Sequence, residues 1–133
     1  LAILMPIVAS MGGIAGMQSL ALVIRSQALD QIGSSNSRLL ILKEASIGVL
    51  NGLLWSSIVA LAVYLWFESV FLGIVIASAL LINLIIGAIS GVSLPLILAR
   101  LKIDPALAGG VILTTITDIV GFISLLGIAT LIL

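Results

Sequence analysis

Long apolar stretches alternate with short polar ones along this chain of 133 residues. A membrane-spanning helix needs about 20 predominantly apolar residues, and four of the apolar stretches are that long. We expect these spans at about residues 1–24, 45–66, 70–98 and 106–133. Four spans with short connections use most of the chain and leave no room for a soluble domain. The pattern therefore predicts an all-α integral membrane protein, with residues 1–133 forming one transmembrane domain.

Polar residues mark the connections between the predicted spans. Residues 25–44 form the longest connection and residues 99–105 a shorter one, and together they contain every lysine and arginine of the chain. The connection between the second and third spans holds only the acidic Glu68. By the positive-inside rule, we expect the two basic connections in the cytoplasm and both ends of the chain outside. A Gly-Ser-Ser-Asn-Ser run predicts a solvated loop in the longer connection, together with a short interfacial helix near Leu39–Leu42.

The composition narrows the classes of function. Hydrophobic residues make up 62% of the chain and charged residues 8%, and the mean hydropathy of +1.49 lies far outside that of ordinary soluble domains. The absence of cysteine and histidine excludes zinc sites built on those residues, iron–sulfur clusters, His- or Cys-ligated haem and His-based triads. A bound metal would need oxygen ligands, which hard cations prefer. Five basic and five acidic residues cancel, so no cationic face indicates nucleic acid as a partner.

Glycines concentrate in the middle of the first span. Gly12 and Gly16 are four residues apart and share a helix face, which permits the close helix contact typical of small-xxx-small packing in membranes. A second interpretation stays open beside this one. Gly12, Gly13 and Gly16, next to Gln18, would loosen the helix and free backbone carbonyls to line a cavity. The four residues then form one wall of a pathway.

The second and third spans carry polar and small residues that favour helix packing. Asn51 is expected to hydrogen-bond a neighbouring helix, which is worth only about 0.6 kcal/mol on average in membrane proteins. Asn83 is expected to contribute to helix packing. Gly87 and Gly91 form a second glycine pair with a spacing of four. These residues are therefore interpreted as packing residues.

Asp118 is an acidic residue near the middle of the last span. A charged side chain at the bilayer centre costs roughly 2.5 to 3.5 kcal/mol on insertion scales, so it calls for a reason. Gly110, Thr114, Asp118 and Gly121 recur at helical spacing and form one small, polar stripe, flanked by Thr117. Because buried polar atoms in a membrane need partners, the stripe is expected to face protein or water rather than lipid.

Two interpretations of Asp118 remain open at this stage. In one, Asp118 hydrogen-bonds Gln18, Asn51 or Asn83 and only fixes the packing of helices. In the other, Asp118 lines an aqueous pathway, and a passing cation supplies the counter-ion, since no lysine or arginine lies in the apolar part of a predicted span. A cation channel or transporter and a membrane scaffold are thus the two leading classes. An intramembrane enzyme is less favoured, because a single aspartate makes a catalytic pair only in a dimer.

The order of these residues resembles the membrane domain of the MgtE family of magnesium channels. The first span is similar to the second transmembrane helix of that family in Pro6, the run Gly12-Gly13-x-Ala15-Gly16-x-Gln18-Ser19 and Arg25. The second span is similar to the third family helix in Lys43-Glu44, Gly48 and Asn51-Gly52. The last two spans follow the fourth and fifth helices in Asn83, Gly87, Pro95, Asp104-Pro105-Ala106 and Thr114-Thr115-x-x-Asp118-x-x-Gly121-Phe122.

This resemblance implies a homodimer with five helices per subunit in the lipid bilayer of the cell membrane, either inner or plasma membrane. The pore would be lined by the first and last spans of both subunits, with Mg²⁺ as the transported ion. Asp118 would attract the hydrated ion and the main-chain carbonyl of Thr114 would assist, beside Thr117 and Gly110. The opposite wall would contain the glycine run and Gln18. A first transmembrane helix and cytosolic CBS-type regulatory domains are expected upstream.

One position departs from the family pattern. The family usually has Asn between the second glycine and the alanine of the glycine run, and this chain has Ile14. If that Asn lines the pore, the change would alter the hydration of the ion and the selectivity. Transport of another divalent cation, such as manganese or cobalt, is therefore one alternative to magnesium transport. A scaffold that transports nothing, in which Asp118 only packs helices, is the other.

Overall fold

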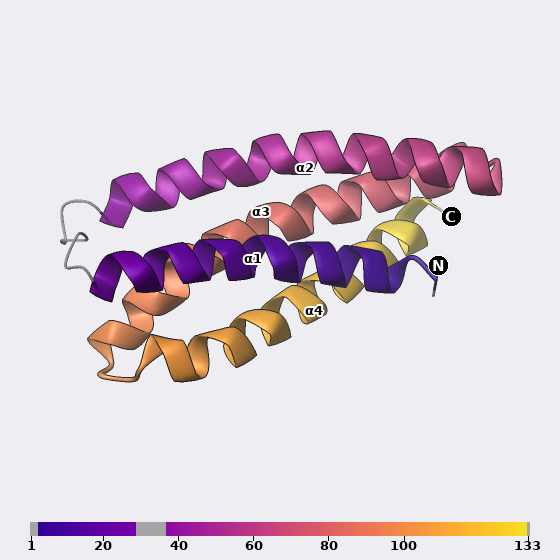
Figure 1. Cartoon of the computed structure of the whole chain (residues 1–133). Helices are drawn as coiled ribbons and strands as arrows, with labels where there is room; N and C mark the ends of the chain where they lie inside the picture. Colours follow the sequence, from indigo (N-terminus) through magenta and orange to yellow (C-terminus); the bar gives the residue numbers. More distant parts are fainter. Residues whose placement is uncertain (1–2, 29–36, 133) are drawn as a thin grey trace.

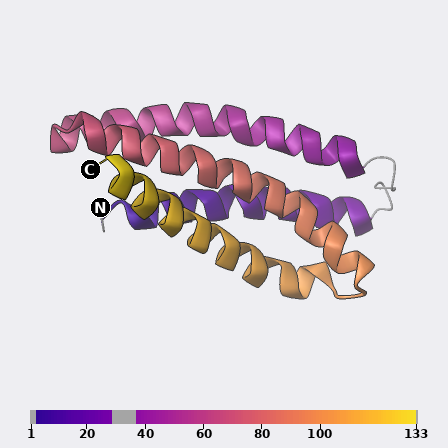
Figure 2. The same cartoon turned by 180° about the vertical axis from the view of Figure 1, so that it is seen from behind.

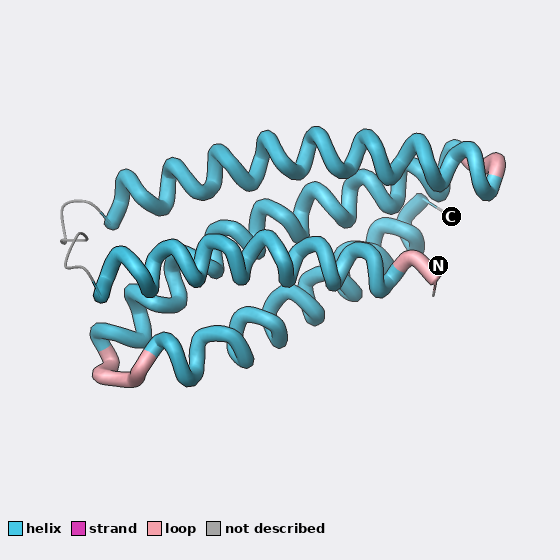
Figure 3. Tube along the Cα trace, viewed as in Figure 1, coloured by secondary structure: helices cyan, strands magenta, loops and turns pink. Residues whose placement is uncertain are grey.

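The structure is a computed structural model that describes residues 3–28 and 37–132. It contains four helices, α1 (Met5–Ala28), α2 (Ser37–Phe67), α3 (Val70–Arg100) and α4 (Pro105–Ile132) (Figure 1). All regular secondary structure in the described part is helical, as the colouring of Figure 3 makes visible. Each helix is long and apolar enough to cross a membrane. The expectation of an all-α membrane protein with four spans is therefore confirmed.

Helix α3 occupies the centre of the bundle. It packs against each of the other three helices, and α1 and α4 also pack against each other. Figure 2, seen from behind, shows α2 on one side of α3, with α1 and α4 on the other side. Among the most buried side chains are Ile76, Leu80, Asn83 and Val92 of α3, each with none of its surface exposed. The hydrophobic core thus follows the axis of α3, while the outer faces of α1, α2 and α4 expose large apolar side chains.

A two-residue turn joins α2 to α3 and makes them antiparallel neighbours. Glu68 adopts a positive φ of 53°. The side chain of Ser69 caps α3 by accepting a hydrogen bond from the backbone N–H of Leu72 at 3.3 Å. At the opposite end of the bundle, Lys102 adopts a φ of 60° in the turn before α4. Both turns are short, so the two helices that each turn joins lie next to each other along most of their length.

The first connection contains more helix than its composition predicts. Of residues 25–44, α1 includes those up to Ala28 and α2 those from Ser37 onward, while residues 29–36 lie outside the described part. The short helix expected near Leu39–Leu42 belongs to the first turns of α2. The physical reason is that Glu44 points into the protein, where only 5% of its surface is exposed. A polar stretch that was interpreted as solvated is thus partly the start of a packed helix.

The two glycine pairs pack against each other and bring α1 close to α3. A Cβ atom added to Gly87 would lie 2.5 Å from the carbonyl oxygen of Gly12. A Cβ atom added to Gly91 would collide with the carbonyl oxygen of Gly16. Helix α1 runs without interruption through its glycines. The glycines therefore serve close backbone approach, and the interpretation that they loosen the helix is wrong.

Candidate functional site

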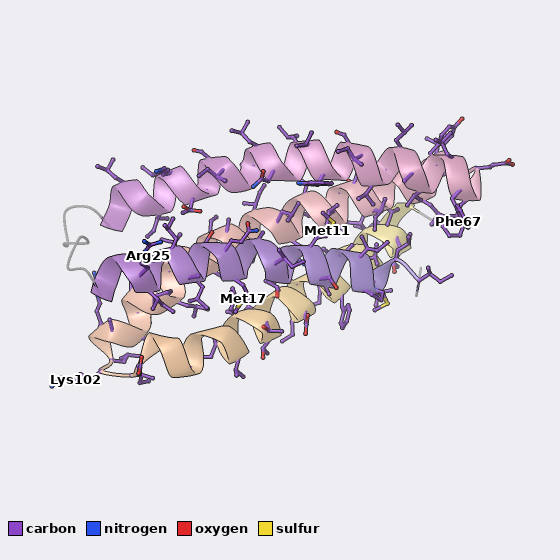
Figure 4. All side chains as sticks on the ribbon, in the orientation of Figure 1. Met11, Met17, Arg25, Phe67 and Lys102 are labelled. Carbon is purple, nitrogen blue, oxygen red and sulfur yellow. The ribbon has the colours of Figure 1, made fainter. Side chains whose placement is uncertain are left out.

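A groove runs between α1 and α4 along the side of the bundle away from α2. Its volume is about 660 Å³. The seven α1 residues that line it are Ala9, Ser10, Gly13, Ile14, Met17, Gln18 and Ala21, and the two α4 residues are Thr114 and Asp118. Met17 is labelled between the two helices in Figure 4. We call this feature the Asp118 groove.

Asp118 and Thr114 lie one helical turn apart on α4 and both face the Asp118 groove. Asp118 is half-buried and Thr114 is exposed. Within residues 3–28 and 37–132, the carboxylate of Asp118 makes no hydrogen bond and no ion pair. The predicted packing bonds from Asp118 to Gln18, Asn51 or Asn83 are therefore absent from the described part. The carboxylate is open to a ligand in the groove.

The hydroxyl groups around Asp118 are bonded within α4. Thr114 Oγ1 donates to the carbonyl oxygen of Gly110 at 2.8 Å. Thr117 Oγ1 lies 3.1 Å from the carbonyl oxygens of both Leu113 and Thr114. The Thr114 carbonyl also faces the backbone N–H of Asp118, as in any α-helix. The Thr114 carbonyl oxygen, which is expected to assist at an ion site, thus already has two hydrogen-bond donors nearby, the Thr117 hydroxyl and the backbone N–H of Asp118.

Thr117 and Gly110 lie at the contact between α4 and α1, rather than in the groove lining. Thr117 is fully buried, and a Cβ atom added to Gly13 would lie 3.7 Å from its hydroxyl oxygen. A Cβ atom added to Gly110 would lie 3.7 Å from Cε of Met17. Both were expected to line a pore, and in the described structure both instead set how closely α4 approaches α1.

The four residues predicted to form a pore wall on α1 lie on two different faces of this helix. Gly13 and Gln18 line the Asp118 groove, whereas Gly12 and Gly16 do not. A Cβ atom added to Gly12 would collide with the side-chain amide of Asn83, and one added to Gly16 would lie 3.0 Å from the carbonyl oxygen of Gly87. Successive residues of a helix are about 100° apart, so Gly12 and Gly16 face α3 when Gln18 faces the groove.

Asn83 lies where α1, α3 and α4 meet. Its Nδ2 donates to the carbonyl oxygen of Val8 at 2.8 Å, which joins α3 to α1. Its Oδ1 is buried and has no partner in the described part of the chain. Gly12 and Gly121 give the amide its space, since a Cβ atom at Gly121 would lie 3.0 Å from Nδ2. The stripe residue Gly121 therefore faces Asn83 rather than the groove.

Asn51 differs from its prediction. Its side chain makes no hydrogen bond to a residue of the described part, and it lines a separate cavity between α1 and α2. The same cavity contains a polar contact that the sequence analysis missed, in which Ser19 Oγ donates to Glu44 Oε2 at 2.9 Å. The signal was present in the spacing of Glu44, Gly48 and Asn51, which recur on one face of a helix. The contact between Ser19 and Glu44 is not predicted from the sequence because Glu44 lies in a polar stretch that is typical of a solvated connection.

The fold and the groove define the class of this protein. It is a multi-pass helical membrane protein whose last helix holds a carboxylate and a hydroxyl on the wall of an open groove. A family model described as "Divalent cation transporter" matches residues 5–128. The chain therefore belongs to the MgtE family.

Curated relatives agree with this assignment. The chain is 40% identical over 130 residues to the magnesium transporter MgtE of Bacillus subtilis, and 33% identical over 133 residues to that of Thermus thermophilus. It is 30% identical over 131 residues to the magnesium transporter MgtE of Enterococcus faecalis. These matches cover 98%, 100% and 98% of this chain respectively, but only 29% of each relative. The chain thus spans less than a third of the length of the relatives it matches.

Proposed function

We propose that this chain belongs to the membrane part of a transporter that moves Mg²⁺ along the Asp118 groove. The observation that carries the proposal is the carboxylate of Asp118, which has no partner in the described residues and lines a groove deep in a membrane span. The names of the relatives support magnesium as the ion. They also favour transport over catalysis as the activity.

The chemistry of the groove suits an ion that keeps its water. Mg²⁺ dehydrates reluctantly and is commonly held by one or two carboxylates while it retains several waters. Asp118 supplies the negative charge. The water hydrogens need acceptors, which the Thr114 hydroxyl and the side-chain amide oxygen of Gln18 supply from the two walls. The Thr114 carbonyl becomes an additional acceptor when Thr117 turns its hydroxyl towards Leu113 alone.

We further propose that two copies of this chain form a homodimer around the pathway. The Asp118 groove is open on the side away from α3, where Ile14, Met17 and Val111 are exposed at 59%, 44% and 72%. A second copy related by a two-fold axis would cover these apolar side chains. It would also place a second Asp118 opposite the first, so that two carboxylates share one hydrated ion.

The distribution of charge supports an orientation in the cell membrane. Arg25 and Lys102 lie at one end of the bundle and Phe67 at the other, as Figure 4 shows. By the positive-inside rule, the basic end faces the cytoplasm. CBS-type regulatory domains in the intact protein would lie on that side. The much greater length of the relatives agrees with additional domains.

Ile14 favours a second candidate, transport of manganese or cobalt in place of magnesium. Its side chain lines the Asp118 groove where the family pattern has Asn, so the groove offers one amide fewer to the waters of the ion. A larger or more readily dehydrated ion would tolerate this loss better. A non-transporting scaffold would make no use of the open carboxylate of Asp118.

Ion flux in proteoliposomes tests the proposal. The intact protein should carry Mg²⁺ into the vesicles, and Asp118→Asn should lose most of this flux because it removes the only charge among the described residues of the groove wall. Glu68→Gln is the matched control, since it removes a carboxylate from the exposed turn between α2 and α3. Competition with manganese, cobalt and calcium identifies the preferred ion. Equal flux in the Asp118 variant and the control would overturn the proposal.

A further inference from the structure

A second polar groove lies on the opposite flank of α1, between α1 and α2 and above α3. Two cavities of about 130 Å³ and 230 Å³ overlap there and share Ala15, Gln18, Asn51 and Leu84. The smaller one also contains Ser19 and Glu44. Because α1 and α2 scarcely touch each other, this space stays between them. We call it the Glu44 groove. It shares Ile14 and Gln18 with the Asp118 groove, and its other lining residues lie outside the transport pathway proposed above.

Glu44 is the most deeply buried acidic residue of the described chain. Only 5% of its surface is exposed, and it lies within the apolar span Ile41–Phe67. Its Oε2 accepts a hydrogen bond from Ser19 at 2.9 Å, which leaves Oε1 for a ligand in the cavity. Its neighbour Lys43 is exposed, and the described residues that line the groove include no base. One neutral hydroxyl does not balance the charge of a carboxylate that is this deeply buried in protein.

Two side-chain amides share the cavity with Glu44. Asn51 follows Glu44 by two turns on the same face of α2, and Gln18 projects from α1 on the other side. Neither side chain makes a hydrogen bond to a described residue. In a membrane, polar groups without partners are costly. Both amides therefore have oxygens available to a ligand in this groove.

We propose that the Glu44 groove is a second cation site, which binds a hard divalent cation with Glu44, Asn51 and Gln18. The available ligands are a carboxylate and two side-chain amides, so all of the coordinating atoms are oxygen, as Mg²⁺ and Mn²⁺ prefer. The smaller cavity has room for waters that remain on the ion. The ion neutralises Glu44 and bridges α1 to α2, which otherwise meet mainly through Ser19 and Glu44.

Counting the Mn²⁺ ions bound to the purified protein tests this site. Electron paramagnetic resonance of Mn²⁺ should show that Glu44→Gln loses a class of bound ion that Asp118→Asn retains. The double variant should lose both classes. Glu68→Gln should bind as the unaltered protein does. Asp118→Asn tests the Asp118 groove and Glu44→Gln tests the Glu44 groove. The two variants therefore distinguish failure of the transport proposal from failure of the proposal for the Glu44 groove.

Two further variants separate a cation site from a simple packing contact. Ser19→Ala removes the hydrogen bond to Glu44 but keeps the ion ligands, so bound Mn²⁺ should remain. Asn51→Leu removes a ligand without disturbing Glu44 and should weaken Mn²⁺ binding at this site, even if Glu44→Gln does not fold. If Glu44→Gln retains the full number of bound ions, the proposal is overturned and Glu44 is a packing residue. If Glu44→Gln does not fold, the same result for Asn51→Leu overturns it.

Discussion

In the proposed pathway, the hydroxyl of Thr117 would control how the Thr114 carbonyl acts at the Asp118 groove. It lies within hydrogen-bond distance of that carbonyl, at 3.1 Å, and of the Leu113 carbonyl at the same distance. A buried hydroxyl that can choose between two acceptors lets the Thr114 oxygen alternate between bonding within the helix and bonding a hydrated ion. In the proposed site, Asp118 would supply the charge, and Thr117 would determine whether the Thr114 carbonyl oxygen joins it as a second ligand.

Thr117→Val tests this control. Valine has nearly the same shape but no hydroxyl, so the Thr114 carbonyl loses a competing donor. We expect Mn²⁺ to bind about two- to tenfold more tightly at the Asp118 groove, since one net hydrogen bond is worth about 0.5 to 1.5 kcal/mol. Thr115→Val is the control, because the exposed Thr115 hydroxyl bonds Val111 outside the groove. Unchanged affinity in Thr117→Val would mean that the Thr114 carbonyl takes no part.

Ile14→Asn tests whether position 14 sets ion preference. Ile14 lines the Asp118 groove and is 59% exposed there, so an amide at this position can hydrogen-bond waters of the ion. We expect Mg²⁺ to gain on manganese and cobalt by severalfold in flux competition. Ile14→Leu keeps the apolar side chain and should leave the preference unchanged. The same preference in both variants and the unaltered protein would exclude a role for this position.

At the scale of helices, the pairs Gly12–Gly16 and Gly87–Gly91 determine how α1 meets α3. The contacts are backbone to backbone, so the helices cannot yield to an added side chain by a change of rotamer. The same contact turns Gly13 and Gln18 towards α4 and the groove. Close packing of one face of α1 against α3 therefore determines which residues of α1 face the Asp118 groove.

Gly91→Ala should destabilise the bundle. Its new Cβ would collide with the Gly16 carbonyl oxygen and lie 2.8 Å from Cβ of Ser19, and overpacking of this kind costs about 1 to 3 kcal/mol. Gly127→Ala is the matched control, since a Cβ there meets nothing within 4 Å and alanine is the better helix former. Thermal unfolding of the purified protein in detergent measures both variants. A Gly91 variant as stable as the Gly127 variant would show that α1 and α3 are not in close contact.

The number and type of the helices could be predicted from sequence because apolar length alone determines them in a membrane. The start of α4 at Pro105 was also predictable from local chemistry, since proline favours the first turn of a helix. The start of α2 was not, because whether Glu44 faces water or Ser19 depends on α1, which is distant in sequence.

For the candidate site, the sequence indicates which residues to consider but not how they are arranged. Asp118 and Thr114 could be identified because a carboxylate and a hydroxyl on one stripe of an apolar span are costly unless used. Which glycines of α1 face the groove could not be predicted, since Gly12 and Gly16 fit both a pore wall and a helix contact. The choice depends on Gly87, Gly91 and Asn83 of α3, whose positions are set only by the assembled bundle.

At the scale of the whole molecule, the charges and the helix ends divide the bundle into two unlike ends. The end of α1, the start of α2 and the turn between α3 and α4 lie together, with the start of α1 and the turn after Phe67 at the other end. The Asp118 groove and the Glu44 groove flank α1, and Gln18 and Ile14 form the ridge between them. Helix α1 is thus the element through which a cation in one groove would affect the other.

The proposed dimer makes a prediction about distances between copies of the chain. Val111 lies two turns before Asp118 on the same face of α4 and is 72% exposed, whereas Leu50, on α2, is 67% exposed on the far side of α3. Because the chain has no cysteine, single variants Val111→Cys and Leu50→Cys can each carry one spin label. Pulsed electron paramagnetic resonance should measure a shorter label-to-label distance for Val111 than for Leu50. A shorter Leu50 distance would mean that α2 forms the interface, and the absence of dipolar coupling at both sites would mean that the chain does not form the dimer.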